Sequence, residues 1–356
     1  MRIADARELW TPAGVYCNTA SYGLPPQPAW DALQAALADW RAGRTSWEPW
    51  GESTEASRAA FARLVGVDAA RVAVGSTVSE LVGSVVTALP AGTRVVVPDI
   101  EFASNLFPYL VQTRLDVRTV PVAFVADAVA DGAGAVAFSA VQMSTGEVAD
   151  VDAILDAAAA VNAVTICDAT QAVGWLPIDA GRFDALVCAA YKWLMSPRGT
   201  AFLTVSERLL ADAVPHSAGW YAGEEVHASY FGPPLRLAHD ARRLDVSPAW
   251  FSWVGSAPAL QLIQEIGVQA IHDHDLALAN RFRDGLGLEP SDSAIVSVDV
   301  PDAAERLTRA GIVAAMRGGR LRTSWHLYND EHDVDRVLEV VLDGRLLHRA
   351  SSRTGS

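Results

Sequence analysis

Two positions in this sequence put a chemically active side chain directly after a short apolar run. Asp168 ends the run AVTICD, and Lys192 comes just after the next run, ALVCAA. Lysine is very rare in this chain, where almost every cation is arginine. Apolar and aromatic neighbours disfavour an ammonium group by desolvation, and the neutral amine that results is able to attack a carbonyl. Asp168, two dozen residues earlier, suits a cationic ring nitrogen.

A third junction adds a candidate anion site. Ser76 and Thr77 in AVGSTVSEL open a predicted helix, where free amides and hydroxyls favour a phosphate. Pyridoxal phosphate requires the first pair, a lysine that forms a Schiff base and a carboxylate that keeps the pyridinium protonated, and the third junction is a natural phosphate cradle. Each of these features has a simpler explanation. Asp168 and the Ser76–Thr77 pair could be helix caps, and Lys192 could be a solvated surface charge. Their order at successive strand-to-helix junctions favours the joint interpretation.

The elements that carry these residues read as an α/β fold. Short apolar runs alternate with helical patterns, which is typical of a mostly parallel sheet covered on both faces. Ligands of such sheets bind beyond the carboxyl ends of the strands. The strands are expected at 71–74, 94–97, 117–120, 135–141, 163–168 and 185–190, and the helices between them at 78–89, 103–114 and 150–160.

The flanking segments complete the predicted organisation. A proline-rich loop precedes a helix over 29–42, and RTSWEPWGES (44–53) is expected to be a second loop before a helix through Phe61 and Leu64. The C-terminal part reads as α+β, with helices at 254–267, 269–285, 302–310 and 331–343 and strands near 295–300 and 320–324. We therefore expect an arm (1–14), a large domain (15–250), a small C-terminal α+β domain (251–348) and a frayed tail (349–356).

Composition narrows the functional class. Hydrophobic residues make up 51% of the 356, enough for a large core, and the formal net charge of −14 argues against a nucleic-acid partner. The N-terminus MRIADARELW carries charges where a signal peptide needs an apolar run, and no stretch approaches the ~20 apolar residues of a membrane span. The three cysteines form no CxxC pair and no histidine spacing suggests a metal site. We expect a cytoplasmic globular protein that acts on a small molecule, with no membrane partner and no metal.

The chain resembles the class V aminotransferases among the fold type I pyridoxal phosphate enzymes, a group that includes cysteine desulfurases, kynureninases and isopenicillin N epimerases. The resemblance runs from about Tyr16 to Leu342. It rests on YCNTASYG (16–23), EFASNLFPY (101–109), VQMSTGEV (141–148), CDATQAVG (167–174), YKWLMSPRG (191–199), RRLDVSPAW (242–250) and LRTSWHLYND (321–330). It implies the fold type I architecture, with a seven-stranded type of sheet in the large domain.

The resemblance also implies roles for individual residues. Lys192 would form the Schiff base and move protons, and Asp168 would pair with the pyridine nitrogen. The remaining cofactor contacts that it implies are Gln171 to the ring hydroxyl, Phe102 stacked on the ring, and Ser76, Thr77 and Tyr191 at the phosphate. Ser247 matches a residue that reaches the partner subunit's phosphate, which implies a homodimer.

For the substrate, the resemblance implies that Arg322 binds the carboxylate of an amino acid. Asn18, Arg317 and Trp47 are further candidate substrate contacts. Arg317 either meets a second acidic group or is a solvated strand-end charge. Trp47 and Trp50 either form an aromatic wall at the mouth of the cleft or anchor helix packing.

The departures from the family pattern bear on the reaction. Cysteine desulfurases stack a histidine where Phe102 lies and need a nucleophilic cysteine ahead of the carboxylate arginine, where this chain has AAMRGGRLR. Kynureninases have a histidine where this chain has Gln171. We expect transamination or C–S/β-elimination, ranked together, with kynureninase-like C–C cleavage or epimerisation as alternatives. A cofactor-binding sensor without turnover is the non-enzyme alternative, and the absence of G-x-G-x-x-G after the first strand disfavours a nicotinamide dehydrogenase.

Overall fold

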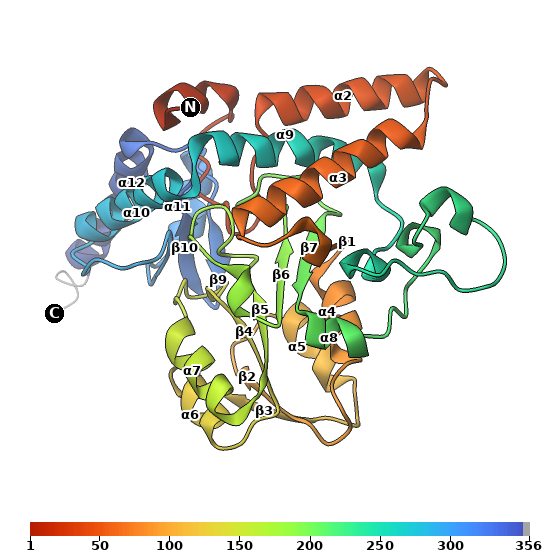
Figure 1. Cartoon of the computed structure of the whole chain (residues 1–356). Coiled ribbons are helices and arrows are strands. Elements are labelled where there is room, and N and C mark those ends of the chain that lie inside the picture. Colours follow the sequence, from red (N-terminus) through yellow and green to blue (C-terminus); the bar gives the residue numbers. More distant parts are fainter. Residues whose placement is uncertain (352–356) are drawn as a thin grey trace.

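The computed structural model (Figure 1) describes residues 1–351, so residues 352–356 of the expected tail lie outside the described part. Its main element is a seven-stranded sheet in the order β1-β7-β6-β5-β4-β2-β3. The strands are β1 (Val72–Gly75), β2 (Arg94–Pro98), β3 (Asp116–Val120), β4 (Ala135–Ser139), β5 (Val164–Asp168), β6 (Ala185–Ala189) and β7 (Ala201–Val205). Strands β2 to β6 pair in parallel, and β7 runs antiparallel to both neighbours. The predicted mostly parallel α/β sheet is confirmed.

Both faces of this sheet are covered, which explains why its strands are continuously apolar. Along β4, Val136 and Phe138 belong to one apolar cluster, whereas Ala135 and Ala137 belong to another. Figure 1 shows α6 (Val125–Ala130) and α7 (Val151–Val161) on one side of the sheet and α4 (Val78–Val86) and α5 (Ala103–Leu110) on the other. Strand β3 lies at the edge, and its residues are largely exposed.

A group of three long helices lies next to β1 and β7, where Phe61 stacks on Phe202. Helix α9 (Trp250–Ile266) packs along α2 (Gln27–Arg41) and α3 (Trp47–Leu64), as Figure 1 shows. The expected loop over 44–53 is wrong, because α3 begins at Trp47. Pro49 fits in the first turn of a helix, where its missing N–H breaks no bond, and packing of Trp47 on Trp250 stabilises that turn.

The C-terminal part contains a three-stranded antiparallel sheet, β8-β10-β9. The N-terminal segment also reaches it, because Tyr16 bridges to Val313 and Asn18 bridges to Ser324. The elements of this part are α10 (Val268–Gly285), β8 (Ile295–Val298), α11 (Ala303–Arg309), β9 (Ala315–Arg317), β10 (Arg320–Ser324) and α12 (Glu331–Ser351), and the remaining short helices are α1 (Ile3–Ala6) and α8 (Glu207–Asp212). Helix α12 continues into the segment expected as a tail, up to Ser351. The proposed domain boundary near residue 250 stays a prediction.

Candidate active site

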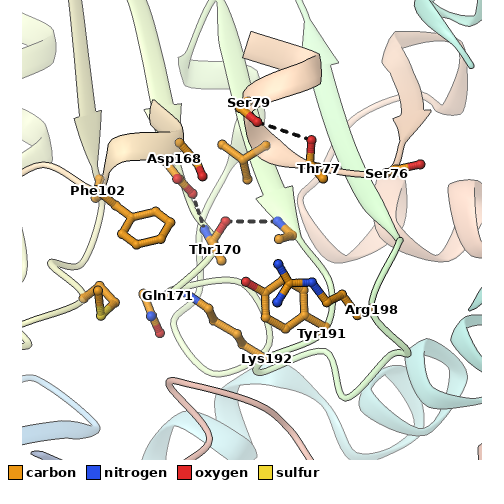
Figure 2. Close-up of a pocket in the computed structure, with 15 residues that line it drawn as sticks. Ser76, Thr77, Ser79, Phe102, Asp168, Thr170, Gln171, Tyr191, Lys192 and Arg198 are labelled. Carbon is orange, nitrogen blue, oxygen red and sulfur yellow. Dashed lines mark hydrogen bonds between the residues drawn. The ribbon is translucent and has the colours of Figure 1, made fainter. Parts of the chain in front are cut away.

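A cavity of about 200 Å³ opens beyond the carboxyl ends of the central strands (Figure 2). The last residues of β4, β5 and β6, which are Ser139, Asp168 and Ala189, all line it. The cavity thus lies at the sheet edge where α/β proteins bind ligands. It brings together the expected cofactor contacts Ser76, Thr77, Phe102, Asp168, Gln171, Tyr191 and Lys192.

Asp168 presents one carboxylate oxygen to this cavity. Its Oδ1 accepts a hydrogen bond from the backbone N–H of Thr170 at 2.8 Å, which fixes the side chain. In the described part of the chain no group donates to Oδ2, which is therefore available to a ligand. Burial raises the pKa of Asp168, and the bonds from Thr170 and the charge of Lys192 oppose that rise.

Lys192 is the only lysine of the chain, and its amine enters the cavity without a hydrogen-bond partner among the described residues. Its Nζ lies 5.7 Å from the ring centre of Phe102 and 5.8 Å from that of Tyr191. Burial lowers the pKa of Lys192 to about 8; the charge of Asp168 opposes this shift, whereas the charges of Arg322 and Arg317 add to it. A substantial fraction of this amine is therefore neutral near physiological pH, as a nucleophile or general base requires.

The backbone around Lys192 is held by close contacts that only glycine permits. The N–H of Gly23 donates to the carbonyl of Tyr191 at 2.9 Å. A Cβ on Gly23 would lie 2.0 Å from the carbonyl oxygen of Lys192, so any larger residue would displace this loop. On the other side, Gly174 has φ +115°, and a Cβ there would lie 2.7 Å from the carbonyl oxygen of Trp193. The lysine loop is thus clamped between two segments.

Gln171 is oriented by two hydrogen bonds within the protein. Its Nε2 donates to the carbonyl of Ala20 at 2.9 Å, and its Oε1 accepts from the indole of Trp193 at 2.8 Å. Because a carboxamide nitrogen has two hydrogens, one remains for a ligand in the cavity.

A buried pair of side chains, His326 and Asp275, supports the same loop. His326 Nδ1 lies 2.7 Å from Asp275 Oδ2, and its Nε2 lies 3.0 Å from the carbonyl oxygen of Trp193. A carbonyl only accepts, so Nε2 carries a hydrogen and Nδ1 shares the second proton with Asp275. Both side chains are fully buried. The pair connects α10 and the segment after β10 to the residue next to Lys192.

The far end of the cavity suits a phosphate. Thr77 caps α4 by accepting from the N–H of Glu80, and the hydroxyls of Ser76, Thr77 and Ser79 border the cavity. The first-turn N–H groups of α4 point at this end and favour an anion. Arg198 also lines the cavity, with its guanidinium 5.1 Å from the ring centre of Tyr191. Arg198 was not predicted as a site residue, although its Pro-Arg-Gly loop directly follows the lysine motif.

Phe102 presents its ring to the cavity from the residue before α5. The preceding Glu101 is buried and accepts from the backbone N–H groups of Phe102 at 3.0 Å and Ser139 at 2.8 Å. Burial raises the pKa of Glu101, and its bonds with Ser139 oppose that rise. Glu101 was not predicted, yet it fixes the position of the ring-facing residue against β4.

Arg322 and Arg317 lie beside the cavity rather than in its lining. Arg322 Nη1 donates to the carbonyl of Met143 at 2.7 Å, and its Nη2 donates to Ser21 Oγ at 2.6 Å. Arg322 is fully buried, so a carboxylate reaches it only when Ser21 or the Met143 side chain turns away. Arg317 donates to the same Ser21 oxygen at 3.2 Å. Asn18 precedes Ser21 by three residues, and its Oδ1 is buried without a hydrogen-bond partner among the described residues.

Like Asn18, Arg317 and Arg322, the expected contacts Ser247 and Trp47 are not among the residues that line the cavity. Ser247 is exposed, two residues after the buried Asp245. Trp47 was expected in a loop at the cleft mouth; it lies in α3 and packs against Trp220 and Trp250, with ring centres 5.1 and 5.5 Å away. The structure therefore favours the packing role for Trp47.

None of the three cysteines of the chain has an accessible thiol in this structure. Cys17, Cys167 and Cys188 are free and fully buried, and burial raises the pKa of each thiol. Within residues 1–351 there is no cluster of three metal-ligating side chains. No helix in that range has the length and apolar character needed to cross a bilayer.

Comparison with known proteins places this geometry in a family. The Aminotransferase class-V family model matches residues 26–308. The chain is 27% identical to the "Uncharacterized aminotransferase YcbU" of Bacillus subtilis over 83% of this chain and 85% of that protein. It is 24% identical to the isopenicillin N epimerase of Streptomyces clavuligerus, covering 96% and 98% of the two chains. Among solved structures, the cysteine desulfurase CsdA of Escherichia coli superposes with a TM-score of 0.83 at 21% identity, over 98% of this chain and 99% of that one.

The residues of the cavity fit the cofactor of that family. A free carboxylate oxygen, an unpaired amine, an exposed aromatic ring and a helix N-terminus with hydroxyls match a pyridinium nitrogen, an aldehyde, a flat ring and a phosphate, respectively. The chain belongs to the class-V aminotransferase family, and its cofactor is pyridoxal 5′-phosphate.

Proposed function

We propose that this protein is an enzyme that acts on an amino acid by transamination or by C–S/β-elimination. One observation carries the proposal. The only lysine amine of the chain and a buried carboxylate with a free oxygen face the same cavity. A surface lysine or a simple helix cap explains neither their burial nor their convergence.

Each residue then has a defined task. When bound, pyridoxal phosphate supplies an electron sink for a carbanion at the substrate Cα. Lys192 Nζ takes the proton from that carbon, because its lowered pKa leaves it able to act as a base. Asp168 Oδ2 holds the proton on the ring nitrogen. The Ser76–Thr77 hydroxyls and the start of α4 bind the phosphate, and Arg198 adds a positive charge there.

Two further roles position the ring and the substrate. Phe102 covers one face of the cofactor, and the remaining amide hydrogen of Gln171 is donated to the ring hydroxyl. Arg322 binds the α-carboxylate after Met143 or Ser21 has moved aside. Ser247, which is exposed in this chain, is proposed to contact the phosphate of a second subunit in a cytoplasmic homodimer. Sedimentation of the holoenzyme tests the dimer.

The buried cysteines argue against a cysteine desulfurase, even though relatives with that name match the chain. Persulfide formation needs an accessible thiolate, and a fully buried thiol with a raised pKa is a poor nucleophile. The residue type at position 171 argues against kynureninase-like cleavage. This chain has a glutamine there, whereas the resemblance places a histidine at that position in kynureninases. Epimerisation remains the alternative that uses the same proton transfer at Cα.

Borohydride trapping tests the proposed role of Lys192 without knowledge of the substrate. Reduction of the holoenzyme should fix the cofactor to one tryptic peptide, and the single lysine makes the assignment unambiguous. The Lys192→Ala variant, supplied with the same cofactor, should remain unlabelled. Label on the N-terminal amine, or none at all in a protein that binds the cofactor, would contradict the proposal.

The Asp168→Asn variant tests the second half of the site. It should still bind the cofactor but lose most turnover, because a neutral amide does not hold the ring proton. A screen of amino acids and thioether conjugates then separates the reactions. Ammonia release without amination of the cofactor supports elimination, whereas an aminated cofactor that needs a keto acid to recycle supports transamination. Turnover of no substrate at all would favour the sensor.

A further inference from the structure

Two arginine side chains meet at one neutral oxygen beside the cavity. Arg322 Nη2 and Arg317 Nη2 lie 2.6 and 3.2 Å from Ser21 Oγ. The two arginines come from the neighbouring strands β10 and β9. A hydroxyl satisfies hydrogen-bond donors, but it carries no charge that offsets the repulsion between two guanidinium groups.

The described part of the chain supplies no carboxylate to either group. The other hydrogen-bond partners of Arg322 are the carbonyl and the sulfur of Met143, and Arg317 also donates to the carbonyl of Met316. Arg322 Nε is buried without any partner. The lack of carboxylates is confined to the surroundings of these two arginines, because acidic residues exceed basic ones in the whole chain by 14. Within residues 1–351, the two arginines therefore have no anionic partner, and an anionic ligand would supply one.

The pair lies where a substrate would be held. Met143 both lines the cavity and contacts Arg322. The charges of Arg322 and Arg317 both act on the amine of Lys192, so the two guanidinium groups are close enough to influence it. The phosphate end of the cavity is at Ser76 and Thr77, on other elements. The cofactor's own phosphate therefore does not neutralise this pair.

We infer that the substrate is an amino acid with a second anionic group, a carboxylate or another oxyacid. The α-carboxylate binds Arg322, and the second group binds Arg317 after displacing Ser21 Oγ. A single carboxylate shared by both arginines would neutralise only one of the two positive charges. The other charge would then stay without a counter-ion beside the buried Arg322, which is unfavourable. This inference rests on the proposed function, because it takes the ligand at Arg322 to be the substrate of the Lys192 chemistry.

Unreactive acids test the inference on the holoenzyme. Glutarate and pentanoate have the same chain length and differ by one carboxylate, and calorimetry at constant ionic strength gives both affinities. We expect glutarate to bind about ten-fold more tightly, the effect of one partly exposed charge-assisted pair. Arg317→Gln should abolish this preference and leave pentanoate binding unchanged, whereas Arg317→Lys should keep part of it. Arg320→Gln is the matched control, since Arg320 is an exposed arginine of the same hairpin that donates to Ser297.

Equal affinity for the two acids in the unmodified protein would overturn the inference. So would an Arg317→Gln variant that weakens both acids alike, because this result means that both arginines hold one carboxylate. Borohydride labelling of the same preparations distinguishes failure of the second-anion inference from failure of the proposed function. Absence of a diacid preference in the unmodified holoenzyme, with intact labelling of Lys192, refutes the second anion alone. Absence of labelling refutes the proposed function and the substrate assignment with it.

Discussion

Arg58 and Arg322 are both buried, but their surroundings differ in charge. Arg58, 3% exposed, donates to the carboxylates of Glu55 and Asp245, and its Nη2 lies 2.7 Å from Asp245 Oδ2. Arg322, 0% exposed, donates only to neutral groups, Ser21 Oγ and the carbonyl and sulfur of Met143. Among residues 1–351, the guanidinium of Arg58 has carboxylate partners and that of Arg322 has none.

The pKa values of the two groups move in opposite directions for this reason. Burial alone would lower the pKa of Arg58, but the charge of Asp245 and the hydrogen bonds that Arg58 donates to Glu55 outweigh burial and raise that pKa. Burial lowers the pKa of Arg322 to about 10, and the charge of Arg317 adds to the shift. A buried charge with carboxylate partners stabilises the fold, whereas one without them indicates a binding site.

The largest effect is expected from Arg58→Met. The substitution leaves Asp245 buried and unpaired, which typically destabilises a protein by about 3–5 kcal/mol. Arg58 Nη1 also donates to the carbonyl of Val72 in β1, so the strand that leads to Ser76 and Thr77 loses an anchor. Chemical denaturation gives the loss of unfolding free energy. The paired variant Arg58→Met with Asp245→Leu should recover part of it, and an unchanged midpoint in the single variant would refute the structural role.

Arg322→Gln should show the reverse pattern. Removing a buried charge that has no counter-ion leaves the free energy of unfolding unchanged or raises it. The same change should lower kcat/KM by roughly 30- to 1000-fold, about 2–4 kcal/mol, because the substrate carboxylate loses its charged partner. Parallel denaturation and steady-state kinetics measure both quantities. A variant that unfolds easily yet keeps its kcat/KM would reverse the assignment of the two arginines.

The local parts of this architecture were predictable from the sequence. Apolar runs with polar residues after them correctly placed Asp168 at the end of β5 and Lys192 in the loop just after β6. Strand β7 was not located, because the short run AFLTV has no helix before it and pairs antiparallel. The helix through Phe61 and Leu64 was predicted, but the start of α3 at 47–53 was taken for a loop. Proline and glycine near that start outweighed packing on α9 that only the tertiary structure supplies.

The long-range contacts of the site were not predictable in the same way. Ser21 and Arg322 are 301 residues apart, and Trp193 and His326 are 133 residues apart. No local pattern shows that a serine in the opening loop bridges two arginines near the C-terminus. The resemblance to the family supplied the arginine, and only the structure shows that its partners are neutral. The distinction between Arg58 and Arg322 is therefore a result of tertiary structure.

The pH dependence of cofactor binding sharpens this distinction. In the cofactor-free protein the pKa of Lys192 is about 8, so the rate of reconstitution with pyridoxal phosphate should rise with pH through that value. The positive charge of Arg322 favours the neutral amine, and Arg322→Gln removes it. The pKa of Lys192 then rises, and the midpoint of the rate profile moves to higher pH. Arg320→Gln should leave the midpoint in place, and a shift to lower pH in the Arg322 variant would contradict this electrostatic account.

The smallest effect is expected from Met143→Leu. Met143 Sδ lies 2.9 Å from Arg322 Nη1, and the thioether is a weak acceptor that leucine of similar volume does not replace. In the free variant, the Arg322 guanidinium therefore lacks one weak hydrogen-bond acceptor. In the complex a substrate carboxylate has replaced the Met143 sulfur, so the substitution does not affect the complex. KM should therefore fall by up to about threefold at constant kcat, within the range of a volume-conserving change. The equivalent change Met316→Leu is the control, because only the backbone carbonyl of Met316 contacts an arginine. A rise in KM for Met143→Leu would mean that the sulfur supports the bound substrate instead of occupying its place.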